Sequence, residues 1–247
     1  MKNDFILIIP ARLESTRLPK KLLINIEWIT IIQRTYNCAL KAVKDKDKII
    51  IATDSELIKN HCEEFGAHVL TTSKDCLTGT DRVAEVSERI DAKQYINLQG
   101  DEPIFPSEDL KLFINKAIKK PEEIHTAITK IKSVLDYRNL SIPKMVFSKS
   151  KRLLYSSRAS IPSNKNGDFK VGFKHVCIYA FNKNHLKEFK DCGKKAFFEN
   201  QEDLEINRFL ELDFIVNCIE LKKGGKAVDT IDDLKIVKKI ITNNQFS

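Results

Sequence analysis

The chain has 247 residues, of which 42% are hydrophobic and 31% charged, so it can bury a sizeable core as one large α/β domain or two small ones. No apolar run approaches the roughly 20 residues that a membrane-spanning helix needs, and residues 1–4 lead straight into a strand-like segment, so we expect a cytoplasmic protein without a signal peptide or a membrane partner. The net charge is +8, and its lysines are spread over the whole length, which is typical of a solvated surface and disfavours a nucleic-acid partner.

The first 120 residues alternate between buried strand patterns and helical patterns. Strands are predicted at 5–10, 48–53, 68–72 and 95–99. Helices are predicted at 29–43, 56–65, 81–90 and 107–119. Gly66 is expected to end the second helix and Ser107 to cap the fourth. This alternation predicts a parallel sheet with helices on both faces, in which ligands bind at the carboxyl ends of the strands.

The second half is less regular. Extended segments are predicted at 125–131, 144–148, 153–162, 173–181 and 216–221, and a helix at 199–212. Thr230 and Asp233 have the spacing of a capping box that opens a last helix, which should end near residue 242. No repeat and no convincing linker is visible, so a single domain spanning residues 1–247 is expected.

A dense basic loop, residues 10–21, follows the first predicted strand. It contains Arg12, Ser15, Arg17 and Lys21. Cationic side chains can neutralise phosphate oxygens while backbone N–H groups cradle them, so the loop predicts a triphosphate site. The loop lacks the glycines of a Walker motif and of a dinucleotide-binding motif. The alternative is an exposed basic loop without a ligand.

Two aspartates are candidate metal ligands. Asp101 lies just past the end of a predicted buried strand, and Asp229 lies far along the chain, before the last helix. Mg²⁺ takes few protein carboxylates and completes its shell with phosphates and water. The alternatives are a turn aspartate for Asp101 and a helix-capping role for Asp229. The six cysteines include no C-x-x-C pair, which argues against a zinc site and a disulfide framework.

Four further motifs carry weaker signals. They are residues 78–82, 155–162 and 175–179, and the run of Glu199, Glu202, Glu205 and Arg208. Glycine and hydroxyl residues at 78–80 allow a ligand to approach a helix start closely. The spacing of three in the last run would place its side chains on one helix face. A solvated face, and a structural role for His175, are the alternatives.

In this order the motifs resemble the 3-deoxy-manno-octulosonate cytidylyltransferase family, over residues 8–234. The shared patterns are P-A-R-x-x-S-T-R-L-P-x-K, T-G-T-D-R, N-x-Q-G-D-E-P, S-R-x-x-I-P, H-x-x-I-Y, E-x-x-E-x-L-E-x-x-R and V-D-T. The resemblance implies an α/β nucleotide-diphospho-sugar transferase fold. That fold has three layers, with a mostly parallel, doubly wound sheet and a smaller β-rich region that helps to form a homodimer.

The resemblance also implies an activity. The family transfers CMP from CTP to the anomeric hydroxyl of an acidic 3-deoxy sugar and releases pyrophosphate, with Mg²⁺ as cofactor. Its product serves lipopolysaccharide or capsule synthesis. The matching positions for nucleotide binding are Arg12, Ser15, Lys21, Thr80 and Gln99. Those for sugar binding are Arg17, Arg82, Gln99, Arg158, His175 and Glu205. Those for metal binding are Asp101 and Asp229, and those for catalysis are Arg12, Arg17, Lys21 and Asp101.

Two departures from the family pattern fall in the motifs expected to contact the sugar. Cys177 replaces a usual glycine, and Ile206-Asn207 replaces a usual Gln-Leu pair. A cytidylyltransferase for a related ulosonic acid, of the 8-amino or sialic-acid type, is therefore the alternative. A non-catalytic binder of nucleic acid or of a nucleotide sugar is a third hypothesis, which rests only on the net charge.

Overall fold

A central sheet organises the protein, whose structure is a computed structural model that describes residues 3–15 and 17–244. Within these residues the main path of the sheet runs β11-β7-β10-β6-β1-β4-β5, and β8 and β9 extend from β10. The strands are β1 (Asn3–Ala11), β4 (Ile49–Thr53), β5 (His68–Thr71), β6 (Ala92–Leu98), β7 (Ile124–Lys130), β8 (Lys144–Phe147), β9 (Leu153–Ser157), β10 (Phe173–Phe181) and β11 (Val216–Glu220). On the main path only β10 runs against its neighbours, so the prediction of a mostly parallel sheet is confirmed.

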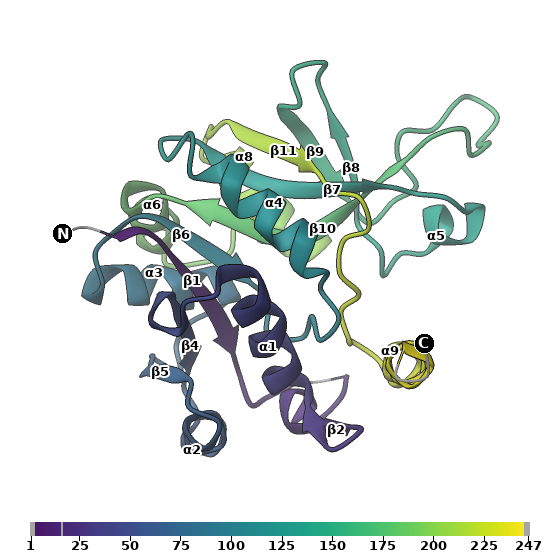
Figure 1. Ribbon diagram of the computed structural model, residues 1–247. Coiled ribbons are helices and arrows are strands. Elements are labelled where there is room, and N and C mark those ends of the chain that lie inside the picture. Colours follow the sequence, from purple (N-terminus) through teal and green to yellow (C-terminus); the bar gives the residue numbers. More distant parts are fainter. Residues whose placement is uncertain (1–2, 16, 245–247) are drawn as a thin grey trace.

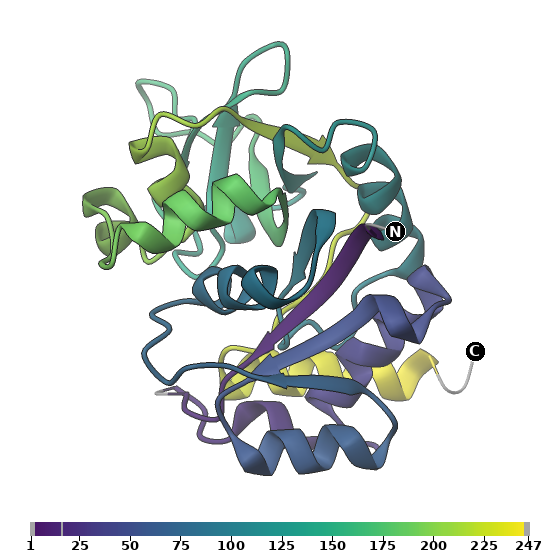
Figure 2. The ribbon, with the colours of Figure 1, turned by 90° about the vertical axis from the view of Figure 1, so that its left-hand side faces the viewer.

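Helices cover both faces of this sheet (Figures 1 and 2). One face carries α1 (Ile31–Val43), α2 (Glu56–Glu64), α4 (Ser107–Ala117) and α9 (Ile231–Asn244). The other carries α3 (Gly79–Arg89), α6 (Lys183–Asp191) and α8 (Ile206–Glu211). Side chains alternate along a strand, so Leu7 and Ile9 of β1 pack in the first layer and Ile6 and Ile8 in the second. Each such buried aliphatic side chain contributes roughly 1.5–3 kcal/mol.

The smaller elements lie in the connections between the main strands and helices. They are the 3-10 helices η1 (Lys21–Leu23) and η2 (Lys46–Lys48), the helices α5 (Val134–Arg138) and α7 (Phe197–Glu202), and the hairpin strands β2 (Asn25–Ile26) and β3 (Ile29–Thr30). The β8–β9 pair and α5 project to one side of the main sheet (Figure 1). None of the described helices is both long enough and apolar enough to cross a bilayer.

The predicted helix at 199–212 is wrong as a single element. The chain breaks between α7 and α8 at Asp203, whose backbone is left-handed with φ of 51°. Aspartate tolerates this conformation better than most residues. Glu199 and Glu202 therefore lie on α7, whereas Glu205 caps α8 and Arg208 lies within it.

Other outcomes concern helix ends and helices that the sequence did not predict. Ser107 does not cap α4, because the N-cap residue is Pro106 and no side chain caps the helix. Neither α5 nor α6 was predicted. The capping box before α9 is confirmed, since Thr230 Oγ1 accepts from Asp233 N at 3.2 Å and Asp233 Oδ2 accepts from Thr230 N at 3.1 Å.

Candidate functional site

Two loops meet at the carboxyl ends of β1 and β6, which are neighbouring parallel strands. Gly100 makes the close approach possible, because a Cβ at this position would lie 2.8 Å from the carbonyl oxygen of Pro10. Thr35 of α1 donates its hydroxyl hydrogen to the Gly100 carbonyl at 3.0 Å. The loop that carries Asp101 is thus held against the loop that carries Arg12.

Asp229 reaches the same place from the far end of the chain. The backbone N–H of Val228 donates to the carbonyl of Asp101 at 2.9 Å. Asp229 N also donates to Asp233 Oδ2 at 3.3 Å, so the start of α9 fixes its backbone. Asp101 and Asp229, which are distant in sequence, are therefore held side by side.

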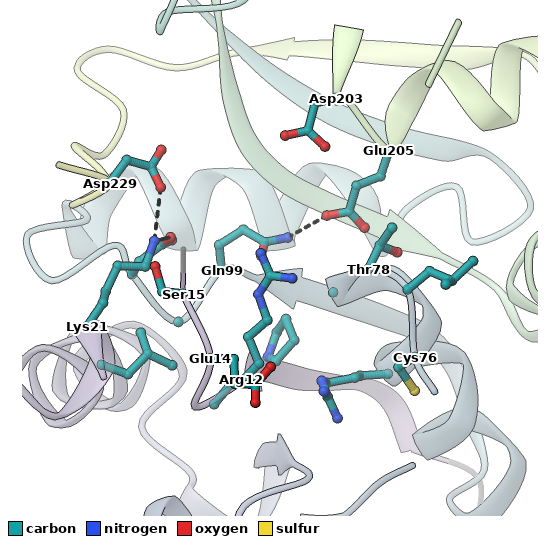
Figure 3. Close-up of a pocket in the computed structure, with 18 of the residues that line it drawn as sticks. Arg12, Glu14, Ser15, Lys21, Cys76, Thr78, Gln99, Asp203, Glu205 and Asp229 are labelled. Carbon is teal, nitrogen blue, oxygen red and sulfur yellow. Dashed lines mark hydrogen bonds and ion pairs between the residues drawn. The ribbon is translucent and has the colours of Figure 1, made fainter. Parts of the chain in front are cut away.

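Lys21 bridges the two carboxylates, and Figure 3 shows its contact with Asp229. Its Nζ donates to Asp101 Oδ2 at 2.6 Å and to Asp229 Oδ1 at 2.9 Å. Arg17 Nη2 donates to the same Asp229 oxygen at 3.0 Å. Burial alone would lower the pKa of Lys21, but the charges of Asp101 and Asp229 and their hydrogen bonds outweigh it and raise that pKa. The ammonium therefore stays charged.

A cleft with two connected cavities surrounds this cluster. The first, of about 550 Å³, is lined by residues of the basic loop, of the loop before α3 and of the first turn of α3, including Arg12, Ser15, Arg17, Lys21, Thr78 and Arg82. The second, also about 550 Å³, extends toward β10 and α9 and includes Arg158, Lys174, His175, Cys177 and Tyr179. Asp101, Asp229, Gln99 and Glu205 line both cavities, so the cluster lies where they join.

Glu205 fixes the side chain of Gln99 at this junction (Figure 3). Gln99 Nε2 donates to Glu205 Oε1 at 3.2 Å and to Asn97 Oδ1 at 3.4 Å. Both contacts use amide hydrogens, so the Gln99 amide oxygen is left as an acceptor for a ligand. Glu205 Oε2 accepts from Thr80 N at 2.7 Å, and burial raises the pKa of Glu205.

Thr80 and Arg82 are buried and hold this region together. Thr80 is 1% exposed, and its hydroxyl accepts from Asn97 at 3.2 Å. It lines neither cavity, and its contact with the nucleotide stays a prediction. The Arg82 guanidinium donates to Thr72 at 2.7 Å and to Asp54 at 2.6 Å. Arg82 reaches the wall of the first cavity, but these bonds give it a structural role, and direct sugar contact stays a prediction.

His175 lies in the second cavity as a buried, neutral ring. Its Nε2 is 3.0 Å from the hydroxyl oxygen of Thr126, which itself donates to the carbonyl of Ile178 at 3.2 Å. With its hydrogen in the bond to Ile178, the Thr126 hydroxyl accepts from His175 Nε2, so we assign the ring proton to Nε2. Burial lowers the pKa of His175 to about 3.

We expect this ring to remain neutral, with the proton on Nε2, down to about pH 5, because burial disfavours the imidazolium. Nitrogen-detected NMR of histidine-labelled protein should show one unchanged tautomer for His175 over this range. In a Thr126→Val variant the ring loses its acceptor, so the preference for this tautomer should weaken. A His175 titration midpoint near 6.5, the ordinary value, would contradict the assignment.

Arg158 lines both cavities, and its backbone and side chain are hydrogen-bonded to Glu202. Its Nε donates to the carbonyl of Glu202 at 2.6 Å, and its backbone N–H donates to Glu202 Oε2 at 2.8 Å. Buried Lys144 donates to the carbonyl of Arg158 at 2.6 Å. These bonds fix the Arg158 backbone and orient its side chain beside the cleft.

Sequence reasoning missed other cleft residues, among them Glu14, Glu102, Tyr179 and Asp203. Burial, followed by the nearby charge of Asp101, raises the pKa of Glu102 to about 8. Its Oε2 has no hydrogen-bond partner among the described residues, and it packs so closely on Gly225 that a Cβ there would lie 2.0 Å away. Glu102 and Tyr179 lie inside motifs already singled out, so their position beside chosen residues was the available signal.

The carboxylates suit a hard cation with few protein ligands. Across residues 3–15 and 17–244, no group of three or more His, Cys, Asp or Glu side chains is arranged to hold a metal. Asp101 and Asp229 nevertheless meet on a single ammonium, so one cation can reach both. Mg²⁺ is usually coordinated by one or two protein carboxylates, with phosphates and water in the remaining positions. All six cysteines are free.

Comparison with known proteins gives consistent similarities. The family model described as cytidylyltransferase matches residues 6–217. A 3-deoxy-manno-octulosonate cytidylyltransferase of Chloroherpeton thalassium is 35% identical over 242 residues, 96% of this chain and 97% of that protein. One from Francisella tularensis subsp. holarctica is 39% identical over 246 residues, 95% and 97% of the two chains. A solved CMP:2-keto-3-deoxy-manno-octonic acid synthetase complexed with CTP has a TM-score of 0.88 at 30% identity, covering 97% of this chain and 99% of that one.

Proposed function

The chain belongs to the cytidylyltransferase family, and we propose that it transfers CMP from CTP to 3-deoxy-manno-octulosonate with release of pyrophosphate. The observation that carries the proposal is the Asp101–Lys21–Asp229 cluster at the junction of two cavities. One cavity can hold a nucleotide and the other a sugar acid, so the two substrates would meet at this cluster.

The reaction is an in-line displacement at the α-phosphorus of CTP. The anomeric oxygen of the sugar forms the new P–O bond, its proton passes to solvent, and the bond to pyrophosphate breaks. Arg12, Ser15 and Lys21 would bind the phosphates, and Arg17, which already contacts Asp229, would lie near the reacting phosphate. Catalysis would come from positioning and charge neutralisation rather than from a covalent intermediate.

We propose Mg²⁺ as the cofactor, held by Asp101 and Asp229. When bound with the nucleotide it would neutralise phosphate charge and polarise a phosphoryl oxygen. The chain's own contribution is to hold both carboxylates within reach of one cation and to surround the triphosphate with Arg12, Arg17 and Lys21.

The sugar acid would occupy the second cavity, against Gln99, Arg158, His175 and Glu205. A related ulosonic acid is the second candidate for the acceptor substrate, and one observation supports it. Of the two departures from the family pattern, Cys177 lies on the wall of this cavity, whereas Asn207 is buried and donates to the carbonyl of Ser156 at 3.0 Å. Cys177 is therefore the position at which a different sugar would be accommodated.

A pyrophosphate-release assay tests the proposal. With Mg²⁺ and 3-deoxy-manno-octulosonate, we expect turnover with CTP and far less with ATP, GTP or UTP. A panel of sugar acids, including the 8-amino derivative and N-acetylneuraminate, identifies the preferred acceptor. Turnover with another ulosonic acid alone would move the assignment to the second candidate, and no CTP-dependent release with any acid would overturn both.

Assembly and location are proposals that accompany the function. The β-rich side of the molecule exposes large apolar side chains, among them Leu135 at 79% and Leu140 at 65%. Burying them against a second copy would remove apolar surface from water, so we propose a homodimer. We also propose that the enzyme acts in the cytoplasm, where CTP is made. Its product would serve lipopolysaccharide or capsule synthesis.

A further inference from the structure

The Lys21 ammonium occupies the position that a metal ion would need. Nζ lies 2.6 Å from an Asp101 oxygen and 2.9 Å from an Asp229 oxygen, whereas Mg²⁺ lies about 2.0–2.1 Å from its carboxylate oxygens. A cation coordinated by both oxygens would therefore overlap with Nζ, and the two positive charges would repel each other. Asp101 Oδ2 and Asp229 Oδ1 therefore cannot hold the ammonium and the metal at the same time.

We propose that Lys21 and the divalent cation compete for the Asp101–Asp229 pair, so that the cation binds tightly only after a triphosphate draws Lys21 away. The inference rests on the proposed function, because it takes the pair as the metal site and the first cavity as the triphosphate site. By this competition the free enzyme discriminates against metal without nucleotide.

The local structure allows the ammonium to move while its backbone stays in place. Lys21 starts η1 directly after Lys20, whose backbone is left-handed with φ of 51°. Leu22, the next residue, is 5% exposed and belongs to the core. The lysine side chain is a flexible four-carbon stem that ends in a point charge. Lys21 Nζ can therefore turn from the carboxylates to a phosphate oxygen in the cavity that it lines.

The same loop supplies the charges that respond to the nucleotide. Arg17 also donates to Asp229, and Arg12 lines the first cavity. A triphosphate in that cavity offers Lys21 and Arg17 new anionic partners and leaves the carboxylates free. Coupling between two ligands is reciprocal and is typically 5- to 150-fold. Nucleotide should raise metal affinity by a factor in this range, and metal should raise nucleotide affinity equally.

Mn²⁺ binding without nucleotide tests the competition independently of turnover. We would measure it by the EPR signal of free Mn²⁺ and by calorimetry on wild-type protein, Lys21→Met and Lys20→Met. Methionine keeps the stem of lysine and removes the charge. Lys20 is exposed, so its variant controls for the loss of one positive charge in the same loop. Lys21→Met should bind Mn²⁺ at least about tenfold more tightly than wild type, and Lys20→Met should not.

Two further arms complete the test. The double variant Lys21→Met/Asp101→Asn should lose the gain, which locates the Mn²⁺ at the carboxylate pair. A non-hydrolysable CTP analogue should tighten Mn²⁺ binding to wild type and have a smaller effect on Lys21→Met. Equal or weaker Mn²⁺ binding by Lys21→Met, in a protein that still melts cooperatively, would overturn the competition even if CTP turnover is found. A gain in Lys21→Met without CTP turnover in wild type would uphold the competition and overturn the proposed function.

Discussion

Asp101→Asn is expected to lower the turnover number by roughly two to three orders of magnitude, because a metal ligand of this kind supports several kcal/mol of transition-state stabilisation and each 1.4 kcal/mol is a factor of ten. Asparagine keeps the shape of the side chain and loses its charge. The fold should survive, because the backbone bond from Val228 to the Asp101 carbonyl remains and Lys21 keeps its bond to Asp229.

Steady-state pyrophosphate release over a range of Mg²⁺ concentrations measures this effect. The half-saturating Mg²⁺ concentration should rise together with the loss of rate, while the thermal midpoint changes little. Asp232→Asn is the matched control, because the Asp232 side chain is 84% exposed and pairs only with Lys235 on the same turn of α9 among the described ion pairs. Near-normal release by Asp101→Asn would remove this carboxylate from the proposed catalytic site.

The sheet could be predicted from the sequence because its signals are local. The buried run of β1 and the helical period of α1 each follow from neighbouring residues, and right-handed β-α alternation then leaves few arrangements. The helix break at Asp203 had no such signal. Neither glycine nor proline marks it, and the spacing of Glu199, Glu202 and Glu205 matched a continuous helix, so only tertiary contacts could reveal the break.

The site was partly predictable. The basic loop and Asp101 follow strand ends, where a parallel sheet binds ligands, and so their positions followed from the fold. Asp229 was ambiguous from its own surroundings, and only the family resemblance favoured it as a metal ligand. The contact that brings it to Asp101 is a backbone hydrogen bond from Val228, which carries no side-chain signature.

Arg208 is part of a sequence pattern typical of an exposed charged helix, but it forms a buried network of ion pairs. The sequence spacing predicts that Arg208 lies on a charged helix face, yet its side chain has no exposed surface. Its Nε and Nη2 donate to the two carboxylate oxygens of Glu199 at 2.6 and 2.7 Å, and Nη1 donates to Asp81 at 3.2 Å. The guanidinium also stacks 3.7 Å from the ring centre of Phe189. Arg208 therefore joins α7 and α8 to the start of α3.

Arg208→Met should destabilise the protein by about 3–5 kcal/mol, because removing one partner leaves a buried charge uncompensated. Glu199 is 1% exposed and would lose its bidentate partner. Urea unfolding followed by circular dichroism measures the change. A second readout is CTP binding, since Asp81 also accepts from Thr78 at 2.7 Å and so orders a residue of the first cavity.

A double variant separates the buried charge from simple loss of packing. Glu199→Gln/Arg208→Met removes the uncompensated carboxylate, so it should recover a substantial part of the stability lost in Arg208→Met. Arg138→Met is the control for loss of an arginine, because Arg138 is exposed and its change should cost less than about 0.5 kcal/mol. A loss below about 1 kcal/mol in Arg208→Met, or a double variant no more stable than the single one, would show that the Arg208–Glu199 ion pair does not stabilise the packing of α8 on α7. Glu205 lies one turn before Arg208, at the start of α8. Its contacts to Gln99 and Thr80 therefore depend on the position of α8 in the fold.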